Sequence, residues 1–328
     1  MCDGLPAEES RRRRGDRVTR RVLVTGGAGF IGSNLARGLL ERGDEVRVLD
    51  NFSTGSRANL DGPDIQLVEG ELRSYERVHN AVRGVEVVFH LGGLGSVPRS
   101  VQDPLTTSAV NVEGTLNVLL AARDEGVRRV VFASSSSVYG STAALPAQES
   151  GPVDPISPYG VAKLAAERYC VSFSRVYDSF ETVVLRYFNV FGPRQNPFSQ
   201  YAAAVPLFIT SIAEGRPVTV FGDGEQSRDF TYVANVVDAN LRAAEAPEAN
   251  GRIFNVAAGA PHSVNELADT IGALLGKPVE REFAPQRAGD LRNSYAEVSA
   301  AHDVLGWQPE IGFEEGLRRT AETLLQST

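Results

Sequence analysis

The sequence has few of the residues that build disulfide frameworks or metal centres. Its two cysteines, Cys2 and Cys170, are too few for a disulfide framework, and the helical pattern around Cys170 predicts a buried thiol. None of its four histidines has metal-ligand spacing such as His-Glu-x-x-His. We therefore expect neither a disulfide scaffold nor metal catalysis.

Long apolar runs and net positive charge are also lacking. No apolar run approaches the ~20 residues that cross a bilayer. The arginines at 11–14 are followed by Gly15 and Asp16, not by the apolar stretch of a signal peptide. A formal net charge of −8 argues against non-specific nucleic-acid binding. Residues 1–19 could be an arm for nucleic acid, but a disordered leader is the simpler interpretation, and we expect a cytoplasmic protein without membrane or nucleic-acid partners.

What the sequence does contain is an alternation of short apolar runs and helical patterns. A length of 328 residues favours one large domain with a smaller companion. The alternation predicts an α/β fold, a Rossmann-type doubly wound parallel sheet. The expected strands are 21–24, 45–49, 65–68, 85–90, 129–133 and 182–187, and the expected helices are 31–42, 75–82, 111–125 and 159–176.

A change of composition marks the end of this pattern. Gly192, Pro193 and Pro197 indicate a loop that leaves the sheet. We expect the large domain to span residues 20–190, and a smaller α/β domain to span residues 191–328. That second part contains strand candidates at 218–221 and 253–256, and some of its segments are expected to return to the sheet.

A glycine-rich turn, Thr25-Gly-Gly-Ala-Gly-Phe-Ile-Gly32, follows the first predicted strand. Its glycines allow a tight turn, close approach of a pyrophosphate, and close helix–strand packing, while free N–H groups at the helix start face the phosphates. Asp50 ends the second strand 18 residues after Gly32, where a carboxylate accepts hydrogen bonds from a ribose and repels a 2′-phosphate. The large domain is thus predicted to bind NAD rather than NADP. The expected cofactor contacts are Gly26, Gly29, Phe30, Ile31, Gly32, Asp50 and Asn51.

Tyr159 and Lys163 are four residues apart, so they share one face of a predicted helix. An unperturbed tyrosine has a pKa of about 10 and is a poor base. A neighbouring ammonium group, helped by the positive charge of nicotinamide, stabilises phenolate and lowers that pKa. The spacing alone is also consistent with an ordinary surface pair.

Four serines, Ser134 to Ser137, follow the strand at 129–133. Ligands of open α/β sheets bind at the carboxyl ends of strands, so a serine hydroxyl there can align a sugar hydroxyl with the tyrosine. The alternative is a serine-rich loop without a function.

The glycine spacing, the serine run, Tyr159 to Lys163 and Arg186-Tyr-Phe-Asn189 together resemble the extended short-chain dehydrogenases/reductases that act on nucleotide sugars. The resemblance spans about residues 21–325. It implies Ser135 as the catalytic serine, Tyr159 as the acid/base, and Lys163 as a group that also holds the nicotinamide ribose. It adds cofactor contacts at Glu71 and Leu72. Two departures, Glu71 in place of an aspartate and Gly92-Gly93 in place of Ala-Ala, should loosen the NAD contacts somewhat.

The same resemblance implies a set of contacts to a UDP-sugar. Asn189, Arg228 and Arg287 would hold the diphosphate, because a guanidinium fork matches phosphate oxygens. Asp290 would lie near the uridine ribose and Phe221 near the uracil. The remaining expected substrate contacts are Ser136, Val205 and Ser294.

The residues after the catalytic serine discriminate between the reactions of these enzymes. Dehydratases resembling this chain have an Asp-Glu pair there, and UDP-xylose-forming decarboxylases keep a Glu. Ser136 and Ser137 supply no carboxylate. Inversion at C4 through a 4-keto intermediate is therefore the expected reaction, with a dehydratase or a non-catalytic NAD-binding regulator as lesser alternatives.

The sugar is predicted from one small residue. The motifs around residues 94–100, 186–195 and 201–206 are similar to those of UDP-N-acetylglucosamine 4-epimerases. In epimerases restricted to non-acetylated sugars a tyrosine commonly occupies the place of Ser294, so a serine leaves room for an acetamido group. Ser294 could also be an ordinary surface serine, and the four-serine run also resembles UDP-glucuronate 4-epimerases. The resemblance further implies a homodimer, formed through the helices at Asn111 and Tyr159.

Overall fold

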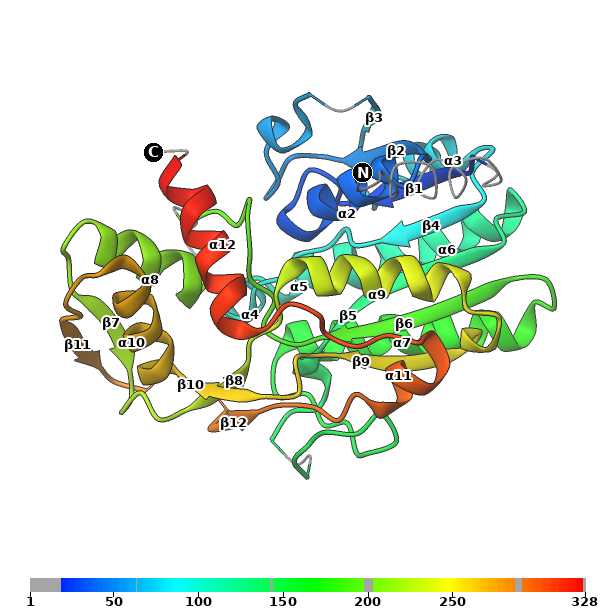
Figure 1. Ribbon diagram of the computed structural model, residues 1–328. Coiled ribbons are helices and arrows are strands. Elements are labelled where there is room, and N and C mark those ends of the chain that lie inside the picture. Colours follow the sequence, from blue (N-terminus) through cyan, green and yellow to red (C-terminus); the bar gives the residue numbers. More distant parts are fainter. Residues whose placement is uncertain (1–18, 63, 142–143, 198–202, 287–290, 327–328) are drawn as a thin grey trace, which may run out of the picture.

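The computed structural model describes residues 19–62, 64–141, 144–197, 203–286 and 291–326 (Figure 1). Its centre is a seven-stranded sheet in which all paired strands are parallel, as the alternation of strands and helices predicts. Across the sheet the strands are β3 (Ile65–Glu69), β2 (Glu45–Asp50), β1 (Arg21–Thr25), β4 (Val87–His90), β5 (Arg129–Ser135), β6 (Glu181–Tyr187) and β9 (Arg252–Val256).

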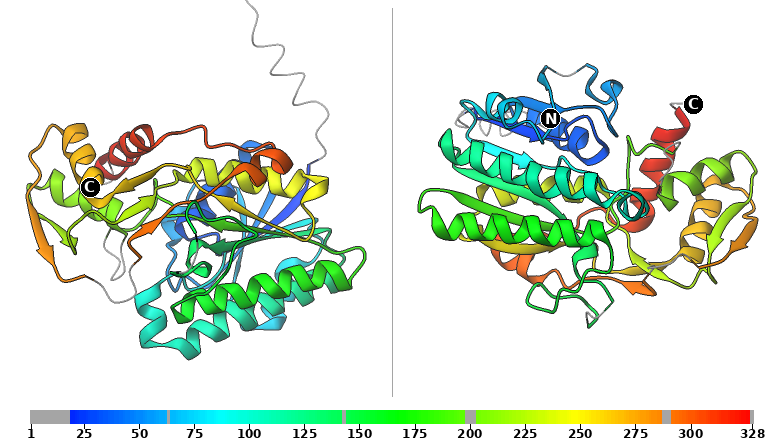
Figure 2. Two further views of the ribbon diagram at one scale, coloured as in Figure 1. Left: turned by 90° about the horizontal axis from the view of Figure 1, so that it is seen from below. Right: turned by 180° about the vertical axis from the view of Figure 1, so that it is seen from behind.

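Helices cover both faces of this sheet, so its central strands are buried on both sides and contain nearly continuous apolar runs. One face packs against α2 (Phe30–Glu41), α9 (Val233–Glu245) and α11 (Ser299–Leu305). The other packs against α3 (Tyr75–Val82), α6 (Gly114–Asp124) and α7 (Pro158–Val176), which lie over the sheet in the view from behind (Figure 2). These two layers make the fold a doubly wound one.

A smaller unit lies beside the carboxyl ends of the strands (Figure 1). Its apolar side chains form a third core. One of its small sheets has the order β10–β8–β12 and the other pairs β11 with β7. The elements are α8 (Ala204–Ala213), β7 (Val218–Phe221), β8 (Ser227–Asp229), β10 (Pro261–Ser263), α10 (Val264–Leu275), β11 (Arg281–Ala284), β12 (Asn293–Ser294) and α12 (Phe313–Gln326).

The chain crosses between the two units more than once. β9 follows β8 in the sequence but pairs with β6 at the edge of the large sheet, and α9 and α11 also cover that sheet. The smaller unit is therefore assembled from separate segments of the second half of the chain.

Three regions differ by more than one residue from the elements expected from the sequence. The strand expected at 129–133 continues to Ser135, so the first two serines of the run belong to β5. The expected helix at 111–125 is a π-helical turn, η2 (Ala109–Glu113), followed by α6. The expected strand at 85–90 begins only at Val87, because the N–H of Val85 donates to the carbonyl of Val82 in the preceding turn. The remaining short elements are η1 (Arg57–Leu60), α4 (Val97–Gln102), α5 (Pro104–Ser108), η3 (Ser136–Val138) and η4 (Pro247–Ala249).

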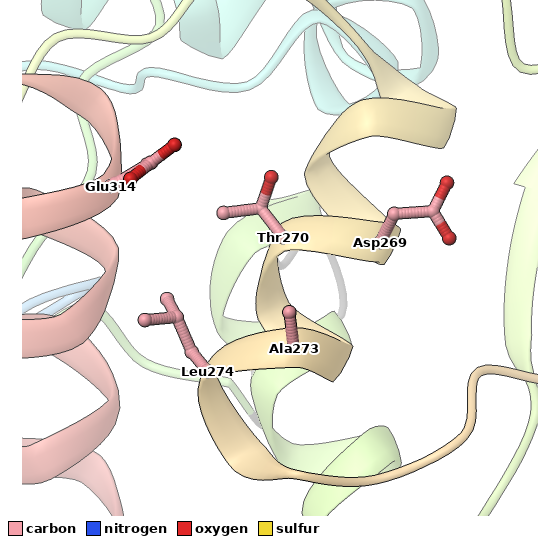
Figure 3. A pocket seen from close by; sticks show the side chains of 5 residues that line it. All are labelled: Asp269, Thr270, Ala273, Leu274 and Glu314. Atoms are coloured by element: carbon pink, nitrogen blue, oxygen red, sulfur yellow. The ribbon is translucent and has the colours of Figure 1, made fainter.

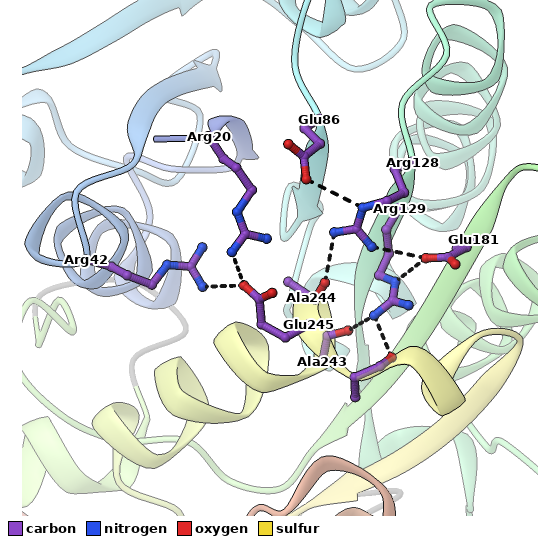
Figure 4. A network of polar contacts seen from close by, with 10 residues as sticks. Arg20, Arg42, Glu86, Arg128, Arg129, Glu181, Ala243, Ala244 and Glu245 are labelled. Atoms are coloured by element: carbon purple, nitrogen blue, oxygen red, sulfur yellow. Dashed lines mark hydrogen bonds and ion pairs between the residues drawn. The ribbon is translucent and has the colours of Figure 1, made fainter. Parts of the chain in front are cut away.

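An arginine network holds the amino-terminal edge of the sheet (Figure 4). Arg129 is 1% exposed, and its guanidinium donates to the carbonyls of Ala243 and Ala246 at 2.7 and 2.8 Å. Its Nε also lies 2.7 Å from the carboxylate of Glu181. These bonds satisfy carbonyls at the end of α9 that have no partner within the helix. Among the described residues, none of the helices has both the length and the apolar character needed to span a membrane.

Candidate active site

The glycine-rich turn between β1 and α2 has the geometry of a phosphate cradle. Gly26 has a φ of +68°, and a Cβ on Gly32 would lie 2.2 Å from the carbonyl oxygen of Gly26. A Cβ on Gly29 would meet only that same oxygen, at 3.2 Å, so the space in front of Gly29 is otherwise open among the described residues. Gly29 also precedes α2 without a side-chain cap, which leaves the first N–H groups of the helix available for an anion.

Asp50 lies beside this turn at the end of β2. One of its carboxylate oxygens accepts from the N–H of Ala28 at 2.9 Å, and the other accepts from the N–H of Phe52 at 2.8 Å. The carboxylate therefore joins the glycine-rich turn to the loop after β2, where Asn51 is exposed and accepts from the N–H of Ser53. The cradle and the carboxylate fit an NAD molecule, whose pyrophosphate would lie at Gly29 and whose adenosine ribose would lie at Asp50.

The two residues expected near the adenine, Glu71 and Leu72, differ in their burial. Glu71 is half-buried and forms an ion pair with Arg73. Leu72 is buried, and a Cβ on Gly92 would come 2.9 Å from its Cδ1. Leu72 thus fills the space that an alanine methyl group at position 92 would need, which gives a physical reason for the glycine.

Tyr159 and Lys163 lie on the first turns of α7. Ser157 caps this helix by accepting from the N–H of Gly160 at 3.1 Å, and Pro158 occupies the first helical position. Burial raises the pKa of the Tyr159 phenol above its ordinary value, and a hydrogen bond with Ser135 lowers it in part. The structure therefore brings Ser135 and Tyr159 together as the sequence predicts.

Lys163 is 6% exposed and lies under the end of β5. Its Nζ donates to the carbonyl of Ala133 at 2.8 Å and lies 4.8 Å from the ring centre of Phe132. Burial lowers the pKa of Lys163 to about 8, against Cys170 and Glu167, which raise it. The lysine and the tyrosine thus flank the end of β5 together.

The serines after Ser135 form a short turn, η3. Ser135 Oγ donates to Ser137 Oγ at 3.1 Å and accepts from the N–H of Ser137 at 3.2 Å. Ser136 is half-buried. No carboxylate belongs to this turn, so it presents hydroxyl groups next to the tyrosine.

Two of the expected substrate contacts are paired in the smaller unit. Ser294 in β12 lies opposite Arg228 in β8 in the parallel register, so their side chains emerge on one face. The Arg228 guanidinium donates to the carbonyl of Ser227 at 2.7 Å.

The other expected substrate contacts are more dispersed. Asn189 follows β6 with a φ of +27° and is exposed. Phe221 is half-buried at the end of β7, whereas Val205 is buried in the first turn of α8. Arg287 and Asp290 lie outside the described residues.

Several buried polar residues support the site without having been predicted from the sequence. Asn111 lies in the π-helical turn, and its side chain accepts from the N–H of Leu94 at 2.8 Å and donates to the carbonyl of Leu94. Asp229, next to Arg228, accepts from the N–H groups of Ala258 and Gly259. A π turn is often found at functional sites, but its extra residue leaves no periodic signal in the sequence.

The described residues contain other hollows and side-chain groups that we do not assign to the site. A hollow of about 460 Å³ between α10 and α12 contains none of the predicted residues (Figure 3). Its lining residues are Asp269, Thr270, Ala273, Leu274 and Glu314. Within the described ranges, no three His, Cys, Asp or Glu side chains gather where they could hold a metal ion.

Comparison with known proteins agrees with this geometry. The chain is 41% identical over 313 residues to a UDP-glucose 4-epimerase of Mycolicibacterium smegmatis, covering 92% of this chain and 97% of the relative. It is 32% identical to a UDP-glucuronate 4-epimerase of Thermodesulfobacterium geofontis, covering 91% and 94%. A solved UDP-N-acetylglucosamine 4-epimerase of Methanobrevibacter ruminantium, in complex with UDP-N-acetylmuramic acid, superposes with a TM-score of 0.90 at 36% identity, covering 95% and 100%.

The match to a family model covers most of the sheet and the expected catalytic residues. It extends over residues 22–257, from β1 to just after β9. The resemblance inferred from the motifs is therefore confirmed, together with the Rossmann-type fold and the dependence on NAD. The chain belongs to the NAD dependent epimerase/dehydratase family.

Proposed function

We propose that the chain is a UDP-hexose 4-epimerase that interconverts UDP-GlcNAc and UDP-GalNAc, and that it also accepts UDP-Glc and UDP-Gal. One observation carries the proposal: Ser135, Tyr159 and Lys163 meet at the end of β5, beside a turn of hydroxyl groups. This arrangement can move a proton at O4 of a sugar, but the turn has no carboxylate with which to eliminate water.

In the proposed reaction the chain acts by proton transfer and orientation. Bound NAD would supply the acceptor and then the donor of the hydride at C4. Ser135 would hold O4 in line with Tyr159, which takes the O4 proton and later returns it. The ammonium of Lys163 would stabilise the phenolate and bind the nicotinamide ribose. Because the 4-keto sugar must present its other face before hydride returns, the substrate contacts have to permit rotation of the sugar.

The substrate contacts are proposed to hold the nucleotide while the sugar turns. Arg228, Asn189 and Arg287 would bind the diphosphate, and Asp290 and Phe221 the uridine. The pairing of Ser294 with Arg228 supports a place for Ser294 near the sugar–diphosphate junction. A serine there would leave room for a 2-acetamido group.

Turnover by the purified protein tests the proposal. Incubation with UDP-GlcNAc, UDP-Glc and UDP-GlcUA, followed by chromatographic separation of the C4 epimers, should show conversion of UDP-GlcNAc. If none of the three sugars changes, the epimerase proposal fails. The Tyr159→Phe variant should keep its fold and lose turnover, and Ser294→Tyr should abolish the reaction of the acetylated pair while sparing the other.

UDP-glucuronate is the second candidate substrate. The run Ser134 to Ser137 resembles the corresponding run in UDP-glucuronate 4-epimerases, and one such enzyme is a full-length relative. Conversion of UDP-GlcUA but not of UDP-GlcNAc would replace the first substrate with this one and leave the C4 chemistry in place.

We also propose that two copies associate through the face formed by the helices at Asn111 and Tyr159, together with α4 and α5, which pack beside them. This face exposes apolar side chains on neighbouring helices, a pattern typical of protein interfaces. Light scattering should give twice the chain mass, and a monomeric mass would contradict the dimer. The exposed side chains are Val101, Leu105, Val161, Tyr169 and Val176.

A further inference from the structure

The last three residues of β5 are each tied to α7, at positions four residues apart on the helix. Ser135 contacts Tyr159, and the carbonyl of Ala133 accepts from Lys163. Between them, Ser134 donates to the carboxylate of Glu167 at 2.5 Å. Because residues four apart lie on one helical face, Glu167 extends the row formed by the tyrosine and the lysine.

Glu167 is 0% exposed and is held by a guanidinium from β6. Nε and Nη2 of Arg186 lie 2.9 and 2.8 Å from the two carboxylate oxygens, so the pair is bidentate. Arg186 is 1% exposed, and its guanidinium lies 4.6 Å from the ring centre of Tyr139. Three elements, β5, β6 and α7, therefore meet at one carboxylate.

A buried ion pair of this kind usually contributes little to the free energy of unfolding. The desolvation of two charges often cancels their attraction, and apolar residues of similar volume are frequently as stable or more so. The position of this pair, one helical turn from Lys163, suggests a different use.

We propose that Glu167, fixed by Arg186, is a positioning residue that keeps the catalytic lysine charged and aligned beneath the end of β5. The role of Lys163 in catalysis rests on the proposed function, whereas the influence of Glu167 on Lys163 does not. Arg186 would act one step further away, by holding the carboxylate in place.

The charges around Lys163 support this role. Burial lowers the pKa of the lysine, whereas Cys170 and Glu167 on its own helix raise it. From β4, the fully buried His90 faces the lysine and stays neutral, because burial and the charge of Lys163 lower its pKa to about 3. From β6, Arg186 is engaged with Glu167 itself. Glu167 is thus the carboxylate that favours the ammonium form of Lys163.

The sequence offers a direct measurement, because Lys163 and Lys277 are its only lysines. Full-length protein with bound NAD, labelled with ¹³C at lysine Cε, should give two NMR signals, and a Lys277→Arg variant would assign them. The midpoint of the Lys163 titration would then be compared between the parent and Glu167→Met/Arg186→Met, which removes both charges together. If that variant does not fold, Glu167→Gln/Arg186→Gln replaces it in the same titration.

Thr182→Val is the matched control. Its hydroxyl also ties a strand to α7, by donating to the carbonyl of Cys170 at 2.8 Å, but that strand is β6 and the bond involves neither Lys163 nor Glu167. We expect the midpoint of Lys163 to fall by about one unit in the double variant and to stay in place in the control. In the double variant the kcat for the UDP-sugar should fall about tenfold while KM stays within about twofold. This pattern is expected when proton transfer is impaired and substrate binding is not.

Equal midpoints in the parent and the double variant would overturn the proposal, whatever the turnover. An equal shift in the Thr182→Val control would also overturn it, because a loosened α7 would then explain the result. A parent that converts no UDP-sugar would instead contradict the proposed function, and the titration would still decide the role of Glu167.

Discussion

The Nδ1 atom of His90 lies 2.6 Å from the hydroxyl oxygen of Thr25, and both side chains are completely buried. The same hydroxyl accepts from the N–H of Gly92, and His90 Nε2 lies 3.0 Å from the hydroxyl of Thr115. Thr115 donates its own proton to the carbonyl of Asn111. This pattern assigns the imidazole proton to Nε2 and links the glycine-rich turn, β4 and the π-helical turn through one neutral histidine.

Acid should destabilise the protein through His90. Burial lowers the pKa of His90 to about 3, whereas an unfolded histidine titrates near 6.5. Between these values the unfolded state binds more protons, so the free energy of unfolding falls as the pH is lowered from about 6.5 towards 3. The loss attributable to this group is about 4 kcal/mol over that window. Denaturant unfolding at several pH values should show a shallower acid dependence for His90→Gln than for the parent; parallel curves would contradict the prediction.

Ionisation of Asp229 should lower the free energy of unfolding as the pH rises, which is the opposite of the effect of His90. Burial raises its pKa to about 6, although the N–H groups of Ala258, Ala296 and Gly259 oppose the shift. Because the folded state holds this proton more tightly, stability is greatest below the unfolded pKa near 3.8 and decreases as the pH rises towards 6. Asp229→Asn removes the titration, so its stability relative to the parent should rise by about 2 to 3 kcal/mol between pH 4 and pH 7. If the difference in free energy of unfolding between Asp229→Asn and the parent is the same at pH 4 and pH 7, the prediction is wrong.

The elements of the large sheet could be predicted because their signals are local. The strands are continuous apolar runs, and the helices have a clear period and recognisable ends such as Ser157-Pro158. The three glycines of the turn have physical roles that follow from their spacing. The close contacts of Gly26 and Gly32 with neighbouring backbone agree with a tight turn and close helix–strand packing, whereas the role of Gly29 stays a prediction.

The rest of the site depends on contacts between distant segments. β12 spans only Asn293–Ser294, too short for any period, and its pairing with Arg228 in β8 is invisible in the sequence. Glu167 occurs in a helix where a glutamate would ordinarily face water; it is buried because Arg186 reaches it from β6. A buried polar residue of this kind is predictable only when its partner is known.

The arginine at the amino edge of the sheet should matter for stability rather than for turnover. Arg129→Met would leave the buried carbonyl of Ala243 without its donor (Figure 4). The half-buried carbonyl of Ala246 would keep only the N–H of Ala249. One unsatisfied buried carbonyl costs about 1 to 3 kcal/mol, so we expect the free energy of unfolding to fall by about 2 to 3 kcal/mol. Arg128→Met is the control, since Arg128 is 37% exposed in its side chain, and its loss should cost about 1 kcal/mol or less. Arg128 also donates to a helix-end carbonyl, that of Ala244, but from a partly exposed position, so equal losses in the two variants would show that burial of the Arg129 contact is unimportant.

Alanine substitutions at two glycines of the cofactor turn should distinguish an effect on stability from an effect on NAD affinity. A Cβ on Gly32 would collide with backbone, 2.2 Å from the oxygen of Gly26, so Gly32→Ala must displace the start of α2 and lower both stability and NAD affinity. At Gly29 the added Cβ would meet only one atom, at 3.2 Å, and the fold can accommodate it with a small shift. If a pyrophosphate approaches this backbone, Gly29→Ala should keep its thermal stability and bind NAD at least about tenfold more weakly.

Calorimetric titration of NAD into the cofactor-free protein, alongside thermal unfolding, measures both effects. Gly312→Ala serves as the control, because a Cβ there would meet no atom within 4 Å, and it should change neither property. Unchanged NAD affinity in Gly29→Ala would place the pyrophosphate elsewhere, even if Gly32→Ala behaved as expected. Weaker NAD binding by Gly29→Ala without loss of stability would locate the phosphates at the start of α2, where no side chain caps the first N–H groups of the helix.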